Sequence, residues 1–144
     1  MLKIVYPDKK PNIRNLKGKE EIFCLIRKKW LVLTPEEWVR QNFLLFLTLV
    51  LEYPITLIAV EKQIVLSDRK KRFDIVVYNS TLQPHLLIEC KEMNVPLTAQ
   101  VLQQVVVYHA ALPAAALVIT NGVQTHAFRK VDGRLEEVEA WGLL

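Results

Sequence analysis

Residues 72–91, RFDIVVYNSTLQPHLLIECK, decide how the rest of this chain can be interpreted. Two runs, residues 72–78 and 85–91, are rich in Val, Ile and Leu and have the length of strands. Between them, residues 79–84 carry the Asn, Ser and Pro that favour a turn. A connection this short cannot make a parallel crossover, so we expect two adjacent antiparallel strands.

A helix is expected before this hairpin and another after it. Thr34 can cap the first helix, and Glu37 completes a T-x-x-E capping box. This helix should run to about residue 52 and become apolar around nearly its whole circumference, which predicts deep burial. The second helix should span residues 98–111, again with a threonine at its start.

The other apolar runs predict further strands. They are residues 55–65 with an interruption near 62–63, residues 115–120, residues 123–130 after an Asn-Gly turn, and two short strands or a hairpin within 20–33. The order α-β-β-β-α-β is that of an α/β protein with a mixed central sheet flanked by helices. We expect one domain over residues 1–144, with a loosely packed leader at 1–19, a core at about 20–130 and a tail at 131–144.

Composition narrows the class of protein. The chain has 144 residues, of which 51% are hydrophobic and 24% charged, so it can bury a core and is not disordered. Its longest uncharged apolar stretch, residues 41–51, is too short for the roughly 20 residues of a membrane span. Two cysteines without a Cys/His cluster indicate no structural zinc. We expect a soluble cytoplasmic domain that does not bind membranes.

Three ionisable residues interrupt or end the two strands that opened this section. Asp74 lies inside the first strand, and Glu89 and Lys91 end the second. Side chains two apart on a strand project from the same face, and Asp74 can lie across from them. A divalent cation needs oxygen ligands, which Asp74, Glu89 and the backbone carbonyl of Cys90 could supply. Such a metal activates water and stabilises a phosphoryl transition state, and Lys91 could orient that water.

A purely structural alternative explains the same residues. An E-x-K triplet is common in chains of this size, and Asp74 could form a buried salt bridge with Lys91 beside a solvated Glu89. The helix at residues 98–111 adds Gln104 and Tyr108 on one face, which could contact phosphate or face solvent.

The mild net charge of +4 gathers in two basic clusters. These are residues 27–29 and 69–72, which could contact phosphates or could simply be a solvated turn and a protected strand edge. The three histidines are dispersed, so we interpret His85, His109 and His126 as structural or surface residues. The side chain of Cys90 should point to the opposite sheet face from its two neighbours, as a core thiol.

Taken together and in order, five motifs resemble the N-terminal domain of type I restriction enzyme R subunits. More closely, they resemble small stand-alone bacterial proteins of that type, within the PD-(D/E)xK nuclease superfamily. The motifs are TPEEWVRQ at 34–41, AVE at 59–61, RFDIVVYN at 72–79, IECK at 88–91 and TNG at 120–122. The resemblance covers roughly residues 23–128, and it implies a restriction-endonuclease-like core.

The resemblance assigns roles to individual residues. It implies Asp74 and Glu89 as ligands of Mg²⁺, for which Mn²⁺ can substitute, and Lys91 as the catalytic lysine. Glu37 corresponds to a first-helix acidic residue that often joins the metal site, with Glu36 as the second choice. Gln104 and Tyr108 match the family's Q-x-x-x-Y helix. Together with Arg72 of the basic cluster, they are the expected supporting or phosphate-contacting residues.

Two positions depart from the family pattern on the second helix. Val107 replaces a positively charged residue, and His109 replaces an Asn. The expected function is a metal-dependent DNA phosphodiesterase, of endonuclease or exonuclease type, that works with other restriction or repair subunits. The alternatives are a catalytically silent nucleic-acid-binding or assembly module and a plain interaction domain with a structural acidic cluster. Oligomeric state is left open, a homodimer included.

Overall fold

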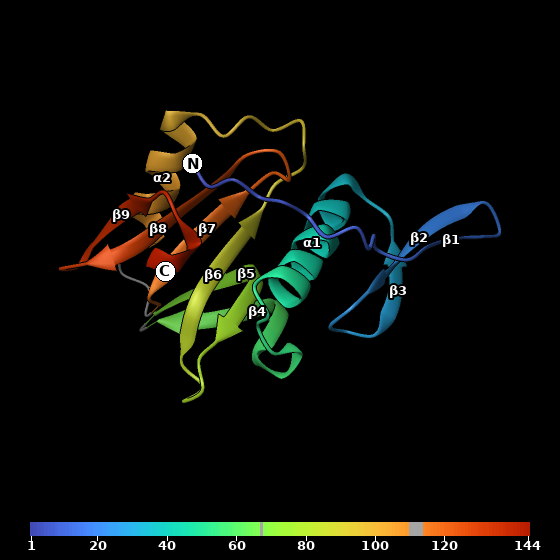
Figure 1. Cartoon of the computed structure of the whole chain (residues 1–144), viewed down its shortest axis with the longest axis horizontal. Coiled ribbons are helices and arrows are strands. Elements are labelled where there is room, and N and C mark those ends of the chain that lie inside the picture. The colour runs from blue at the N-terminus through green and yellow to red at the C-terminus, as the bar shows by residue number, and fades with distance from the viewer. Residues whose placement is uncertain (67, 110–113) are drawn as a thin grey trace.

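A computed structural model of the protein describes residues 1–66, 68–109 and 114–144, without the side chains of Leu66 and Tyr108. A six-stranded sheet forms its centre, and a separate three-stranded sheet stands beside the first helix (Figure 1). The helices are α1 (Pro35–Leu45), which continues as a π-helical turn (Phe46–Val50), and α2 (Ala99–His109). Short 3-10 turns span Ile55–Leu57 and Trp141–Leu143.

The central sheet is mixed. Its order is β4-β5-β6-β7-β8-β9, and only the β6–β7 pair is parallel among the pairs described. The strands are β4 (Ile58–Leu66), β5 (Arg69–Tyr78), β6 (Pro84–Cys90), β7 (Ala116–Thr120), β8 (Thr125–Val131) and β9 (Arg134–Val138). The expected antiparallel hairpin, β5 with β6, is confirmed, and so is the later strand beside β6. The β6–α2–β7 connection makes the parallel crossover that a helix allows.

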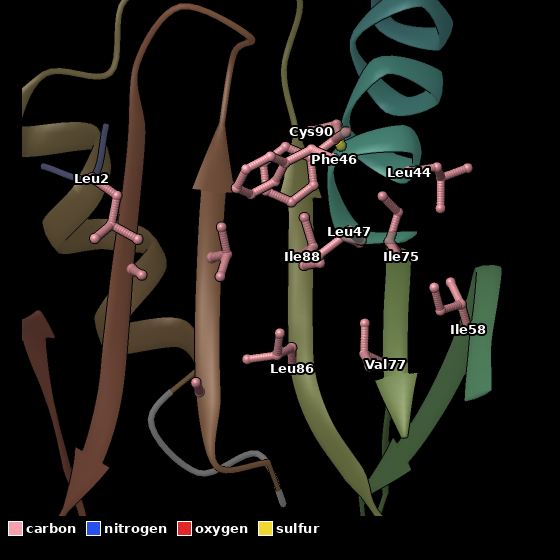
Figure 2. Packing of buried hydrophobic residues seen from close by; sticks show 14 of the residues in the cluster. Leu2, Leu44, Phe46, Leu47, Ile58, Ile75, Val77, Leu86, Ile88 and Cys90 are labelled. Atoms are coloured by element: carbon pink, nitrogen blue, oxygen red, sulfur yellow. The ribbon is translucent and has the colours of Figure 1, made fainter. Parts of the chain in front are cut away.

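The two helices cover opposite faces of this sheet. On one face, α1 and its π-helical turn pack Phe43, Phe46 and Leu47 against inward-facing strand residues such as Ile75 and Ile88. Figure 2 shows this face, with Leu86, Ile88 and Cys90 following one strand. On the other face, Leu102, Val105 and Val106 of α2 pack against a second cluster that includes Phe73 and Leu87. The sheet is therefore buried on both sides, which explains why its central strands are nearly continuously apolar.

The start of α1 is as predicted, and its end is shorter. Thr34 Oγ1 accepts the Glu37 backbone N–H at 3.0 Å, and proline occupies the first turn. The predicted helix to residue 52 ends its α-helical part at Leu45, because five residues then wind as a π-helix. The capping box is half formed, since the Glu37 carboxylate binds other side chains, described below, instead of closing back on residue 34.

The N-terminal residues are more ordered than the loosely packed leader we expected. β1 (Ile13–Leu16), β2 (Lys19–Cys24) and β3 (Lys29–Val32) form an antiparallel sheet, so the predicted hairpin gains a third strand from the leader. Leu2 is buried, and its backbone N–H donates to the Thr125 carbonyl at 2.8 Å. Ile4 and Tyr6 pack against the same core as Leu2, so several side chains dock this segment on the sheet.

The strand before the hairpin is continuous, without the interruption expected near residues 62–63. The irregularity lies one residue earlier, at Glu61, whose φ of 52° is in the left-handed region. On β5, Phe73 packs on the α2 face and Ile75 on the α1 face, although residues two apart normally share a face. Glu61 and Asp74 are not paired in the β4–β5 ladder, although the residues on either side of them are. At this point in both strands, the side chains that faced α2 give way to side chains that face α1. This local exchange is what turns Asp74 out of the regular ladder.

The remaining sequence expectations near α2 and β8 are met where they can be tested. Val101 N–H donates to Thr98 Oγ1 at 3.3 Å, so Thr98 caps α2. The predicted helix end at residues 110–111 lies outside the described residues. The Asn-Gly turn is present, and Gly122 has a φ of 87°, which favours glycine. No helix in the described parts of the chain is long and apolar enough to cross a membrane.

Candidate active site

Asp74 lies where strands β5 and β6 separate. The last Cα pair of their ladder at this end is Ile75 with Ile88. Beyond this pair, a side chain replaces a backbone carbonyl as the hydrogen-bond acceptor between the strands. Asp74 Oδ2 accepts the Cys90 N–H at 2.8 Å. The carboxylate is therefore held against the peptide that joins Glu89 and Cys90, as the sequence analysis required if Asp74 were to lie across from them.

The other Asp74 oxygen binds an arginine that sequence reasoning did not single out. Arg40 of α1 donates to Asp74 Oδ1 at 2.8 Å and to Glu37 Oε1 at 2.6 Å. Its guanidinium also lies 3.2 Å from Glu36 and 3.7 Å from Glu61. Only 5% of Arg40 is exposed. A buried guanidinium needs this many anionic partners, because its desolvation is costly unless charge is balanced.

Glu37 reaches Asp74 only through this arginine. Its Oε1 accepts from Arg40 and, at 3.3 Å, from Arg27, and its Oε2 accepts from Gln41 at 3.0 Å. Glu36, the second choice by resemblance, has the closer electrostatic link, since burial and the Asp74 charge raise the pKa of its carboxyl. The role of Glu37 as a metal ligand stays a prediction, and its described contacts hold Arg27 and Arg40 in place.

Glu89 faces the other way, toward α2. It is buried, with 8% exposed, and its Oε1 lies 3.4 Å from the Lys71 ammonium and 4.0 Å from His109 Nε2. Burial raises the pKa of Glu89, Lys71 opposes this rise, and the Asp74 charge adds to it. The salt bridge that the structural alternative expected, Asp74 with Lys91 beside a solvated Glu89, is not what the described residues form, because Asp74 pairs with Arg40 and Glu89 is buried.

Glu89 and several other candidate residues line an open cavity of about 310 Å³. It is lined by Lys71, Glu89, Lys91, Gln104, Val105 and His109. Lys91 follows β6 directly, and its N–H donates to the Thr120 carbonyl at 2.8 Å, which holds the backbone beside β7. The two residues that the E-x-K pattern pairs, Glu89 and Lys91, therefore share one cavity, and Gln104 of α2 joins them.

Other predicted residues are placed differently. Arg72 is exposed on β5, next to the half-buried Lys71, and does not line this cavity. The Tyr108 side chain lies outside the described part of the chain, so its predicted contact is untested. The Cys90 side chain packs in the α1-side core, as expected for a core thiol. Part of the basic cluster at residues 27–29 is already paired within the protein, because Arg27 forms ion pairs with Glu37 and Glu61.

His109 is the clearest site residue that sequence reasoning missed. It is a buried histidine with Nδ1 at 2.7 Å from the Val105 carbonyl, which agrees with the structural role we expected, and in addition it lines the cavity. A carbonyl only accepts, so Nδ1 carries the proton. Burial and the nearby Lys71, Arg69 and Lys91 charges lower the pKa of His109, which favours the neutral ring. The departure from the family's Asn at this position was the available signal.

The donor set suits a hard divalent cation. Glu89 Oε1 is buried and makes no hydrogen bond within the described residues, although Lys71 lies near it. Each carboxylate oxygen can accept twice, so Asp74 keeps acceptor capacity beside its two bonds. No group of three or more His, Cys, Asp or Glu side chains is arranged to hold a metal in the parts described. Two carboxylates with a backbone carbonyl and water are nevertheless a set that Mg²⁺ accepts.

The fold and the site together define a class: a mixed α/β domain that presents two carboxylates and a lysine where two antiparallel strands separate. The family model for the type I restriction enzyme R protein N terminus matches residues 35–140, so the chain belongs to that family. The match includes Glu36, Arg40, Asp74, Glu89 and Lys91, and it leaves out the basic cluster at residues 27–29. No curated protein matches the chain. Family membership indicates a restriction-related, nuclease-like function.

Proposed function

We propose that the protein is a metal-dependent phosphodiesterase that cleaves DNA, a member of the PD-(D/E)xK superfamily. The observation that carries the proposal is the hydrogen bond from Cys90 N–H to Asp74 Oδ2. It brings the Asp74 carboxylate to the strand end that carries Glu89 and Lys91. Two carboxylates and a lysine near one strand end are groups that can hold a divalent cation and activate water for phosphodiester hydrolysis.

The chain's own residues divide the work. Asp74 and Glu89, with the Cys90 carbonyl, would hold Mg²⁺ or Mn²⁺, and Glu36 or Glu37 would contribute from α1. When bound, the cation supplies a Lewis acid that lowers the pKa of water and offsets charge on the phosphoryl oxygens. Lys91 lines the same cavity as Glu89, so its amine can orient the attacking water or take its proton. Gln104, exposed on α2, can hold a non-bridging phosphate oxygen.

DNA is the substrate we propose because the matched family is the N terminus of a restriction enzyme subunit. The cations around the cavity, including Lys71 and Lys91, suit a polyanion. We propose restriction or repair subunits as partners that direct cleavage, because the matched family is a domain of one subunit of a restriction enzyme.

The test is cleavage by the purified protein. Supercoiled, linear and single-stranded DNA should be incubated with Mg²⁺ or Mn²⁺, with and without a chelator. We expect cleavage that needs the cation and disappears in Asp74→Ala, which lacks a ligand. Nicking of closed circles would identify an endonuclease, and loss of linear ends alone would identify an exonuclease. Cleavage that persists in chelator or in Asp74→Ala would refute the proposal.

One observation favours a second candidate, a nucleic-acid-binding module without catalysis. Internal cations already contact both acidic ligands, Arg40 at Asp74 and Lys71 at Glu89. If these cations are permanent, no divalent ion enters. The second candidate predicts DNA binding without cleavage of any of the three substrates, together with no Mn²⁺ binding by calorimetry.

A further inference from the structure

We propose that Lys71 is a built-in counter-cation of the metal-free site, which a divalent ion displaces from Glu89 and which then binds a DNA phosphate. This inference rests on the proposed function and deepens it, because it names how the site changes between its metal-free and metal-bound forms. It also assigns a substrate contact to a residue outside the Asp and Glu-x-Lys pattern.

Lys71 lies beside one of the proposed metal ligands. Its Nζ is 3.4 Å from Glu89 Oε1. Glu89 is too buried to stay ionised at low cost without a cation nearby, and the Lys71 charge opposes the rise in its pKa. A divalent ion beside Glu89 Oε1 would repel the Lys71 ammonium, because like charges a few ångströms apart repel each other strongly where little water screens them. Movement of Lys71 away from Glu89 relieves that repulsion.

Lys71 is more exposed than Arg40, the other cation that contacts a proposed ligand. The Arg40 side chain is 6% exposed and is surrounded by four carboxylates, so it has no route out of its network. The Lys71 side chain is 31% exposed and ends at the open cavity. Lysine carries a compact charge on a flexible four-carbon stem, which can swing without breaking a planar, bidentate arrangement. Of the two internal cations, Lys71 is the one that can move.

The cavity that Lys71 lines offers its ammonium a place away from Glu89. The lysine shares its cavity with Lys91, Gln104 and a histidine that burial keeps neutral. Its Nζ also lies 5.9 Å from the centre of the Phe73 ring. Once Glu89 is neutralised by the metal, the cavity holds two ammonium groups and one amide donor. That is a set of donors suited to a phosphate of the DNA backbone.

The first experiment measures Mn²⁺ binding to the full chain by isothermal titration calorimetry. Lys71→Gln removes the competing charge and should bind Mn²⁺ about fivefold more tightly or better than wild type. Lys71→Arg keeps a competitor and should bind as wild type or more weakly. Lys62→Gln is the matched control, because it removes one exposed charge from the neighbouring strand β4 and should leave the affinity unchanged.

The second experiment measures binding of a short DNA duplex by fluorescence anisotropy, in chelator and in Ca²⁺. If Lys71 reaches phosphate only after displacement, Lys71→Gln should weaken binding in Ca²⁺ and lower the salt slope there by about 1. In chelator the same variant should bind as wild type. An equal loss in both conditions, or no loss in either, would overturn the phosphate role.

The outcomes separate this inference from the proposed function. If wild type and Lys71→Gln bind Mn²⁺ equally well, and Asp74→Asn does not bind it, the metal site stands and the displacement is wrong. If none of the three binds Mn²⁺, the proposed function falls and this inference falls with it. Tighter binding by Lys71→Gln alone, with unfolding curves matching Lys62→Gln, supports both.

Discussion

Arg40 donates to Asp74 Oδ1 at 2.8 Å, so a residue on the first helix holds the central carboxylate of the candidate site. The same guanidinium binds Glu37 at 2.6 Å, three residues back along α1. A single buried cation thus joins α1 to β5 at the point where β5 leaves its ladder with β6. Because the site and the packing of α1 depend on the same group, stability and function are linked here.

Arg40→Gln should destabilise the protein by about 3 kcal/mol or more, because removing one partner leaves buried carboxylates without a counter-charge. The measurement is urea unfolding of the metal-free protein. Arg14→Gln is the control, since it breaks an exposed ion pair with Glu21 and should cost no more than about 1 kcal/mol. An equal loss of unfolding free energy in the two variants would show that the Arg40 ion pairs stabilise the fold no more than an exposed ion pair does.

Lys91→Ala should separate catalysis from metal binding. We expect kcat to fall roughly a hundredfold or more, because the water loses the group that orients it or takes its proton. Binding of Mn²⁺ should not weaken, since Asp74 and Glu89 remain and a positive charge has been removed from the cavity. The measurements are single-turnover DNA cleavage and calorimetry. A parallel loss of Mn²⁺ binding would mean that Lys91 acts through the ligands and not on the water.

Leu2→Ala should cost about 2–3 kcal/mol of unfolding free energy, because Leu2 is 4% exposed and a cavity would replace its side chain. Val5→Ala, three residues on, is the control, because Val5 is 68% exposed and should contribute less than about 0.5 kcal/mol. Thermal unfolding followed by circular dichroism gives both values. A small effect at both positions would show that the N-terminal segment is not part of the cooperative unit.

The stability that Cys24 contributes should grow as the pH rises from 7 to 9.5. Burial alone would raise the pKa of this thiol, but hydrogen bonds from the Arg27 side chain and backbone outweigh it and lower the pKa below 9.0. A lowered pKa in the folded chain means that the unfolded chain holds its proton to higher pH. The folded state therefore gains stability as the pH passes upward through that interval.

The comparison that tests this uses Cys24→Ser, which keeps a hydrogen-bond acceptor but does not titrate. Urea unfolding gives the free energy of unfolding of both proteins at pH 7 and at pH 9.5. The difference in this free energy between wild type and Cys24→Ser should be larger at the higher pH. A gap that is constant or narrows would contradict the lowered pKa. Using the difference between variants cancels the titration of the lysines and tyrosines that the two proteins share.

The hairpin that carries the site could be predicted because its signals are local. The apolar runs of β5 and β6 and the polar turn between them lie within twenty residues, and the antiparallel pairing follows from the short connection. The N-cap of α1 is similarly local, since Thr34 and Glu37 are three apart. Signals of this kind need no knowledge of distant residues.

The residues that sequence reasoning missed all act across large sequence separations. Arg40 and Asp74 are 34 residues apart, and Lys71 meets Glu89 only because β5 and β6 run side by side. His109 looked like an isolated histidine until α2 was placed over the sheet. The exchange of faces at Glu61 and Asp74 involves two strands at once, so neither strand's own pattern reveals it.

By itself, the sequence determined the two helices, the antiparallel β5–β6 pair and the presence of Asp74, Glu89 and Lys91 near one strand end. It could do so because helix caps, strand alternation and turn residues are properties of neighbours along the chain. Only the tertiary structure decided which charges face one another: Arg40 at Asp74, and Lys71 at Glu89. Burial sets the strength of those contacts and the pKa of Glu89, and burial depends on how the helices pack on both faces of the sheet.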